Sequence, residues 1–142
     1  MSMELLEFPQ VRAIEPASRP LILVVDDDPD LVETLEIRLK QQRLDTISAN
    51  SCQQALGLAH ERLPDLILLD LRLPDGDGMR VCERLTDAAE TGHIPIIVLS
   101  GSDRPDIVRH SRAAGSRYFV RKPYDPNALL LLIQDCLVEA VG

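Results

Sequence analysis

Five short apolar runs recur along this chain, and each is followed by a segment with the periodicity of a helix. The runs are Leu21–Val25, Leu44–Ser48, Leu66–Leu69, Ile94–Leu99 and Arg117–Val120. Three of them are continuously apolar, which is typical of strands that are covered on both faces of a parallel sheet. Strands that alternate with helices predict a doubly wound α/β fold, in which five helices flank a five-stranded parallel sheet with right-handed crossovers.

The predicted helices carry recognisable end signals. Asp28 or Asp30 is expected to cap the first helix, because a carboxylate can accept from the free amides of the first turn. The last helix is expected to begin at Asp125-Pro126 and to run to about Glu139, since proline is favoured at the first helical position. The apolar face of the first helix is formed by Leu31, Leu35 and Leu39.

Length and charge limit the classes of protein that fit. The chain has 142 residues, which suits one domain, and we expect residues 1–18 to be an N-terminal extension to a domain at 19–142. Its net charge of −8 argues against direct nucleic-acid binding by this chain. The apolar runs are too short to span a membrane, and the first residues do not resemble a secretory signal. We therefore expect a cytoplasmic protein with no membrane segment.

Polar side chains stand where four of the predicted strands end. They are Asp26, Asp27 and Asp28, then Asp70, then Ser100 and Ser102, and finally Arg121 and Lys122. The carboxyl ends of parallel strands meet at one edge of an open α/β sheet, which is where ligands bind. Of these groups, three carboxylates, a hydroxyl and an ammonium are therefore expected to converge there.

This combination of groups points to phosphoryl transfer onto an aspartate. Neighbouring carboxylates repel one another unless a cation lies between them, and Mg²⁺ is the hard ion that suits one or two carboxylates, water and a phosphate. An ammonium can neutralise a phosphoryl oxygen, and a carboxylate can accept the phosphoryl group as an acyl phosphate.

Four segments then resemble the response regulator receiver domain of two-component signalling, the CheY-like family with a flavodoxin-like fold. The segment Leu21–Asp28 resembles its first strand and acidic pocket, and Leu66–Gly78 resembles its phosphoacceptor strand and following loop. Val98–Gly101 is similar to its hydroxyl-bearing strand, and Lys122–Tyr124 to its lysine turn. The resemblance covers roughly residues 19–140, so the domain at 19–142 is identified as a receiver domain.

The resemblance implies a role for each residue of the site. Asp70 is expected to be phosphorylated, and Mg²⁺ to be held by Asp27, Asp70 and the backbone carbonyl of Arg72, with Asp26 acting mostly through water. Lys122 is expected to bind a phosphoryl oxygen and to form a cis peptide bond with Pro123.

The resemblance also implies a switch. Ser100 is expected to bind another phosphoryl oxygen and to shift on activation, and Phe119 is expected to move inward with it. Gly78 is expected to permit the turn into the third helix. We hypothesise that Arg72 reaches the phosphoryl group and slows the attack of water; the alternative is that it points into solvent.

The expected partners follow from the same resemblance. The phosphodonor is expected to be a histidine kinase or a phosphotransfer protein. The run Leu129–Ile133 covers more than a full helical turn, so part of it must face outward. We hypothesise that the fourth helix, fifth strand and fifth helix form a surface that dimerises or meets a partner. Alternatively, Leu5, Leu6 and Phe8 of the extension cover these leucines.

Two further questions stay open at this stage. A degenerate receiver that serves only as a protein-interaction module is the alternative function, although such proteins lack part of the acidic pair, the acceptor or the lysine. The chain is either free-standing or part of a longer protein with an output domain. In either case it is expected to assist its own phosphorylation and slow dephosphorylation, and not to be an enzyme with a turnover substrate.

Overall fold

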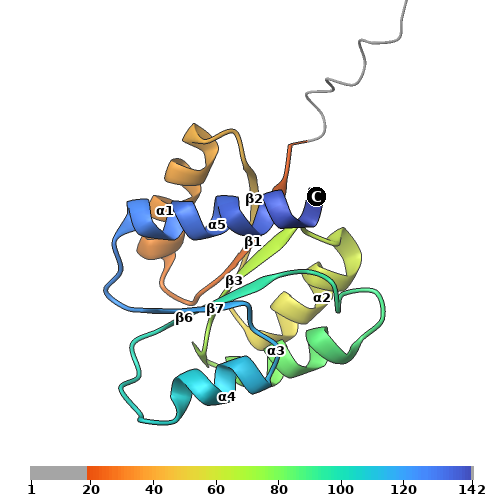
Figure 1. The fold of residues 1–142 in the computed structure, drawn as a ribbon, viewed down its shortest axis with the longest axis vertical. Coiled ribbons are helices and arrows are strands. Elements are labelled where there is room, and N and C mark those ends of the chain that lie inside the picture. The colour runs from red at the N-terminus through yellow and green to blue at the C-terminus, as the bar shows by residue number, and fades with distance from the viewer. Residues whose placement is uncertain (1–18, 142) are drawn as a thin grey trace, which may run out of the picture.

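A computed structural model describes residues 19–141, with side chains as far as Val138 (Figure 1). The predicted extension at 1–18, and with it the contact suggested for Leu5, Leu6 and Phe8, lies outside the described residues. The elements are β1 (Leu21–Val25), α1 (Pro29–Gln41), β2 (Asp45–Ala49), α2 (Cys52–Arg62), β3 (Leu66–Asp70), β4 (Arg72–Leu73), β5 (Gly76–Asp77), α3 (Gly78–Asp87), β6 (Ile96–Ser100), α4 (Ile107–Ala113), β7 (Tyr118–Arg121) and α5 (Pro126–Val141).

The main sheet confirms the predicted doubly wound fold. Its five strands are all parallel and lie in the order β2-β1-β3-β6-β7. Within the described part of the chain, five helices flank this sheet. Helices α1 and α5 cover one face, and α2, α3 and α4 cover the other (Figure 1). The predicted fourth helix is thus α4, and the predicted fifth strand is β7.

The central strand β3 is buried on both faces, as its continuous apolar run predicts. Leu66 and Leu68 pack against α1 and α5, whereas Ile67 and Leu69 pack against α2 and α3. All four are fully buried. Each large aliphatic side chain removed from water contributes about 1.5–3 kcal/mol, so this strand anchors both layers of the core.

The strand bounds differ from the predicted ones by one or two residues. The second and last strands begin and end one residue later than predicted, and β6 begins two residues later, at Ile96. The backbone ladder decides these bounds. Ile67 of β3 donates to the carbonyl of Pro95 and is then paired with Ile96, so the ladder reaches Ser100 and carries it into the sheet.

The starts of α1 and α5 agree with the sequence, and α5 ends at Val141, two residues beyond the predicted end. Asp28 is the cap of α1 and accepts from the amides of Asp30 at 3.1 Å and Leu31 at 3.4 Å. Helix α5 begins at Pro126, and the carboxylate of Asp125 accepts from the amide of Asn127 at 3.0 Å. These contacts satisfy amides that have no partner within their own helix.

Helix α5 exposes part of its leucine run, as predicted. Leu129 and Ile133 are fully buried against the sheet, whereas Leu131 is 68% exposed and Leu130 and Leu132 are partly buried. In the part of the chain that the structure describes, no helix has the length and apolar character needed to cross a membrane.

Candidate functional site

The strand ends bring the predicted site residues to one edge of the sheet. Asp26 directly follows β1, Asp70 and Ser100 end β3 and β6, and Lys122 directly follows β7. These four strands are neighbours in the order β1-β3-β6-β7. The parallel register therefore places residues from four separate segments around one point.

Three carboxylates form the acidic side of this point. One oxygen from each of Asp26, Asp27 and Asp70 lies within 4.8 Å of the others. Asp26 and Asp70 are buried, whereas Asp27 is exposed. Carboxylate oxygens at this spacing, open to solvent on one side, fit a hard divalent cation that keeps part of its water shell. The donor set therefore suits Mg²⁺.

Lys122 contacts two of the three carboxylates. Its ammonium lies 2.9 Å from Oδ2 of Asp26 and 3.6 Å from Oδ2 of Asp70. Burial alone would lower the pKa of Lys122, but the hydrogen bond to Asp26 and the charge of Asp70 outweigh it, so this pKa is raised. The ammonium is therefore kept charged. The peptide bond between Lys122 and Pro123 is cis, as predicted.

Asp70 lies in an environment that disfavours its charge. Burial raises the pKa of Asp70, and the neighbouring charge of Asp26 adds to this effect. The backbone amide of Arg72, which donates to Oδ1 of Asp70 at 3.2 Å, and the ammonium of Lys122 act in the opposite direction. A further cation beside Asp70 would therefore stabilise the charged form of this carboxylate.

Asp26 is held differently from the other two carboxylates. Its Oδ2 accepts from Lys122, and its Oδ1 accepts from the amide of Asp28 at 3.0 Å. Both oxygens therefore already have a protein donor. This arrangement is compatible with the expectation that Asp26 acts on a cation mostly through water.

Ser100 lies beside Asp70 on the next strand of the sheet. It is 4% exposed, and its Oγ accepts from the amide of Ser102 at 3.0 Å. A hydroxyl that accepts one hydrogen bond still has its own proton to donate. Ser100 can therefore donate to an anion at the site without releasing Ser102.

Phe119 lies on β7, opposite Val98 of β6, and packs partly buried against the core. The guanidinium of Arg121 lies over its ring, 5.6 Å from the centroid, and also donates to the carbonyl of Ser102. Arg121 thereby joins the loop after Ser100 to the aromatic side chain. In the sequence Arg121 stands out only by its position at a strand end, although its spacing of two residues from Phe119 places both side chains on one face of β7.

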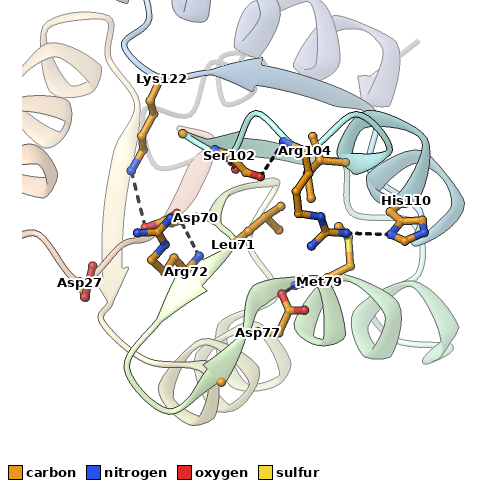
Figure 2. Close-up of a pocket in the computed structure, with 14 residues that line it drawn as sticks. Asp27, Asp70, Leu71, Arg72, Asp77, Met79, Ser102, Arg104, His110 and Lys122 are labelled. Atoms are coloured by element: carbon orange, nitrogen blue, oxygen red, sulfur yellow. Dashed lines mark hydrogen bonds and ion pairs between the residues drawn. The ribbon is translucent and has the colours of Figure 1, made fainter.

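The site opens into a cleft of about 710 Å³ (Figure 2). Asp27, Asp70, Arg72, Ser100 and Lys122 line the same cleft. Its outer part is lined by residues that the sequence did not single out for the site. They are Met79, Ile107, His110 and Asp77, with Arg104 beside His110. Ser102, one of the predicted strand-end residues, lines this cleft as well. The side chain of Arg72 also lines this cleft and is exposed. Its position is compatible both with contact to a phosphoryl group and with pointing into solvent.

Gly78 closes the loop that follows Asp70. A Cβ at this position would lie 2.4 Å from the carbonyl oxygen of Asp70 and 2.8 Å from the Cα of Leu71. Both are backbone atoms that cannot rotate away. Glycine is therefore required for this close approach, as the sequence predicted for the turn into α3.

The chain is similar to characterised regulators of bacterial signalling. The family described as "Response regulator receiver domain" matches residues 22–134. The DNA-binding response regulator MtrA of Mycolicibacterium smegmatis is 40% identical over 117 residues, which are 82% of this chain and 50% of MtrA. The chain thus spans about half the length of the curated relatives it matches.

Solved structures show the same architecture. A CheY-like response regulator receiver domain protein from Methanospirillum hungatei has a TM-score of 0.81 and 25% identity, over 86% of this chain and 96% of that one. The BeF₃-activated N-terminal receiver domain of Klebsiella pneumoniae RstA has a TM-score of 0.76 and 27% identity, over 82% and 97%. The family match, the relatives and the strand-end residues agree, and this chain belongs to the response regulator receiver domains of two-component signalling.

Proposed function

We propose that this receiver is switched by Mg²⁺-dependent phosphorylation of Asp70, with a phosphohistidine of a histidine kinase or phosphotransfer protein as the donor. The observation that carries the proposal is the position of Lys122, whose ammonium lies within 3.6 Å of Asp70, itself one of the three clustered carboxylates. A degenerate receiver would lack part of this set, whereas here the acidic pair, the acceptor and the lysine are all present.

The chemistry is a displacement at phosphorus. A carboxylate oxygen of Asp70 forms a bond to phosphorus while the bond from phosphorus to the donor's imidazole nitrogen breaks, and the electron pair of that bond leaves with the nitrogen. Mg²⁺, when bound by Asp27, Asp70 and the Arg72 carbonyl, supplies positive charge that neutralises the transferred oxygens. Lys122 binds one phosphoryl oxygen, and the hydroxyl of Ser100 donates a hydrogen bond to another.

The acyl phosphate is lost when water attacks phosphorus, and the Asp70 carboxylate is then restored. The chain itself is the group that is modified in both steps. It therefore assists its own phosphorylation and slow hydrolysis, and does not act as an enzyme on a separate turnover substrate.

The output is a change in the surface formed by α4, β7 and α5. When Ser100 shifts toward the phosphoryl group, the loop at Ser102 moves with it because the two are hydrogen-bonded. Phe119 responds through Arg121, which contacts both the loop carbonyl and the aromatic ring. This surface then controls a partner, an output domain or a second copy of the chain.

The charge of the chain bears on whether it contacts nucleic acid directly. The acidic net charge of −8 disfavours direct contact with nucleic acid by this chain. The relative MtrA is a DNA-binding response regulator, and this chain matches half of its length. We place the chain in the cytoplasm, where phosphohistidine donors of this kind act.

Binding of beryllofluoride, a phosphoryl mimic, tests the proposed geometry. Amide resonances of the isotope-labelled chain are recorded with beryllofluoride, with and without Mg²⁺. We expect Mg²⁺-dependent shifts at Asp70, Ser100 and Phe119 and along α4, and none in the Asp70→Asn variant. A native spectrum that does not respond while the fold is intact would favour the degenerate receiver that acts only as an interaction module.

A further inference from the structure

The loop after Asp70 is attached to a helix that takes no direct part in the site. This loop contains a small antiparallel hairpin in which Arg72 of β4 pairs with Asp77 of β5, and Leu73 with Gly76. Asp75 lies at the turn of the hairpin. Its carboxylate accepts from the backbone amides of Cys52 at 2.7 Å and Gln53 at 3.1 Å, which are the first two residues of α2.

Asp75 completes the cap of α2 from a distant part of the chain. The first amides of a helix have no acceptor within the helix, and the helix dipole favours a negative charge near them. The side chain of the local cap, Ser51, accepts from the amide of Gln54, at 3.1 Å. Asp75 supplies the acceptors for the two amides before it. Those two hydrogen bonds lower the pKa of Asp75, so its carboxylate is charged at neutral pH.

The hairpin is also fixed at its other end. The amide of Arg72 donates to Oδ1 of Asp70, and the amide of Gly78 donates to the carbonyl of Leu71 at 2.8 Å. The loop is thus held at its base by the phosphoacceptor strand and at its tip by Asp75 on α2. Arg72 stands between these two attachments, so its position depends on both.

We propose that Asp75 is a positioning residue of the phosphorylation site, which holds the hairpin against α2 and thereby keeps the Arg72 carbonyl in place for the cation. This inference rests on the proposed function, because it assigns the hairpin a task in binding Mg²⁺. Groups that orient a metal ligand without touching the metal typically alter affinity by about 10–100-fold when they are removed.

Ser51 offers a matched control. Both Asp75→Ala and Ser51→Ala remove a cap from the first turn of α2, and both are expected to lower the melting temperature. Only Asp75 belongs to the loop that contains Arg72. A third variant, Asp75→Asn, loses the charge but keeps one carbonyl oxygen that can accept from an α2 amide.

The experiment measures Mg²⁺ affinity of the full chain by titration of amide resonances, together with hydrogen exchange at Cys52, Gln53 and the hairpin. We expect Asp75→Ala to weaken Mg²⁺ binding about tenfold, Asp75→Asn to fall between it and the native chain, and Ser51→Ala to bind as the native chain does. The hairpin amides are expected to exchange faster only in the Asp75 variants.

If Asp75→Ala and Ser51→Ala weaken Mg²⁺ binding equally, the inference is overturned, because the effect then comes from the stability of α2. Unchanged affinity in Asp75→Ala, or Asp75→Asn as weak as Asp75→Ala, would overturn it too. If the native chain itself binds no Mg²⁺, the proposed function fails and this inference falls with it, an outcome distinguishable from native binding that Asp75 does not influence.

Discussion

The ammonium of Lys122 lies 2.9 Å from Asp26 and 3.6 Å from Asp70, so one cation bridges two buried carboxylates that come from different strands. The side chain of Asp26 is only 2% exposed, and that of Lys122 is 24% exposed. A phosphoryl group on Asp70, or a second cation beside it, would therefore change the ion pairing of Lys122 with these two carboxylates.

Removal of Lys122 is expected to destabilise the fold. Loss of one partner of a buried ion pair leaves an uncompensated charge, and the partial exposure of Lys122 moderates a cost that reaches about 3–5 kcal/mol when the pair is fully buried. We expect Lys122→Ala to lower the free energy of unfolding by about 2 kcal/mol. We also expect Mg²⁺ to stabilise this variant more than the native chain. Urea unfolding with and without Mg²⁺ measures both effects.

The exposed Lys40 on α1 provides the control for that experiment. Lys40→Ala is expected to behave as the native chain in both conditions. If Lys122→Ala and Lys40→Ala unfold at the same urea concentration, the bridge between Asp26 and Asp70 does not stabilise the site as described.

The thiol of Cys52 gives a prediction about pH. Burial, followed by the hydrogen bond and charge of Asp75, raises the pKa of Cys52 to about 11. Because an unfolded thiol has a pKa near 9.0, the stability that comes from this shift is fully present below pH 9 and is lost as the pH rises toward 11. At pH 8 the reactive thiolate of Cys52 is then about 100-fold scarcer than that of a free cysteine.

Alkylation by iodoacetamide followed by mass spectrometry measures this effect. We expect Cys52 to react slowly at pH 8 in the native chain and faster in Asp75→Ala, while Ser51→Ala reacts at the native rate. The fully buried Cys82 serves as an internal reference. Rapid labelling of native Cys52 would show that Asp75 and burial do not protect this thiol.

Arg72 is expected to control the lifetime of the acyl phosphate. Its side chain lines the cleft next to Asp70, where a guanidinium can contact phosphoryl oxygens and hinder water. Arg72→Ala should therefore lose phosphate several-fold faster than the native chain in a dephosphorylation time course. The same rate in both proteins would support the alternative that Arg72 points into solvent.

The exposed apolar residues of α5 are expected to act in self-association. Leu131 and Val138 are 68% and 70% exposed, and a spacing of seven residues places them on one side of the helix. We expect sedimentation to show dimers in the presence of beryllofluoride and Mg²⁺, and Leu131→Glu to abolish them. Ile37→Glu on α1, where the native side chain is 53% exposed, should leave the dimer intact.

That experiment is run on the full chain and on a chain that lacks residues 1–18. A dimer that forms only in the shortened chain would indicate that the extension covers the leucines. Monomers in every condition would contradict the dimer hypothesis.

The sequence predicts most of the fold because burial on both faces leaves a continuous apolar run, as in Leu66–Leu69. It also predicts which side chains meet, because parallel strands share one edge: Asp26, Asp70, Ser100 and Lys122 converge as expected. The expectation rests on topology and needs no knowledge of side-chain contacts.

The features that were missed leave little pattern in the sequence. The hairpin of β4 and β5 has only two residues in each strand, too few to show an alternating pattern. The capping of α2 by Asp75 spans 23 positions of the sequence, and periodicity carries no signal for a contact of that kind. The contact of Arg121 with Phe119 is local, because residues two apart on a strand share one face, but the strand period does not show that the two side chains touch.

Intact-mass spectrometry after incubation with acetyl phosphate tests whether Asp70 accepts a phosphoryl group in the presence of Mg²⁺. The native chain is compared with Asp70→Asn and with Asp87→Asn, which alters an exposed carboxylate at the end of α3, each with and without Mg²⁺. We predict the gain of one phosphoryl group in the native chain and in Asp87→Asn, only when Mg²⁺ is present, and no gain in Asp70→Asn. A phosphoryl group that still appears in Asp70→Asn, or that forms equally well without Mg²⁺, would contradict the assignment of Asp70 as the Mg²⁺-dependent acceptor.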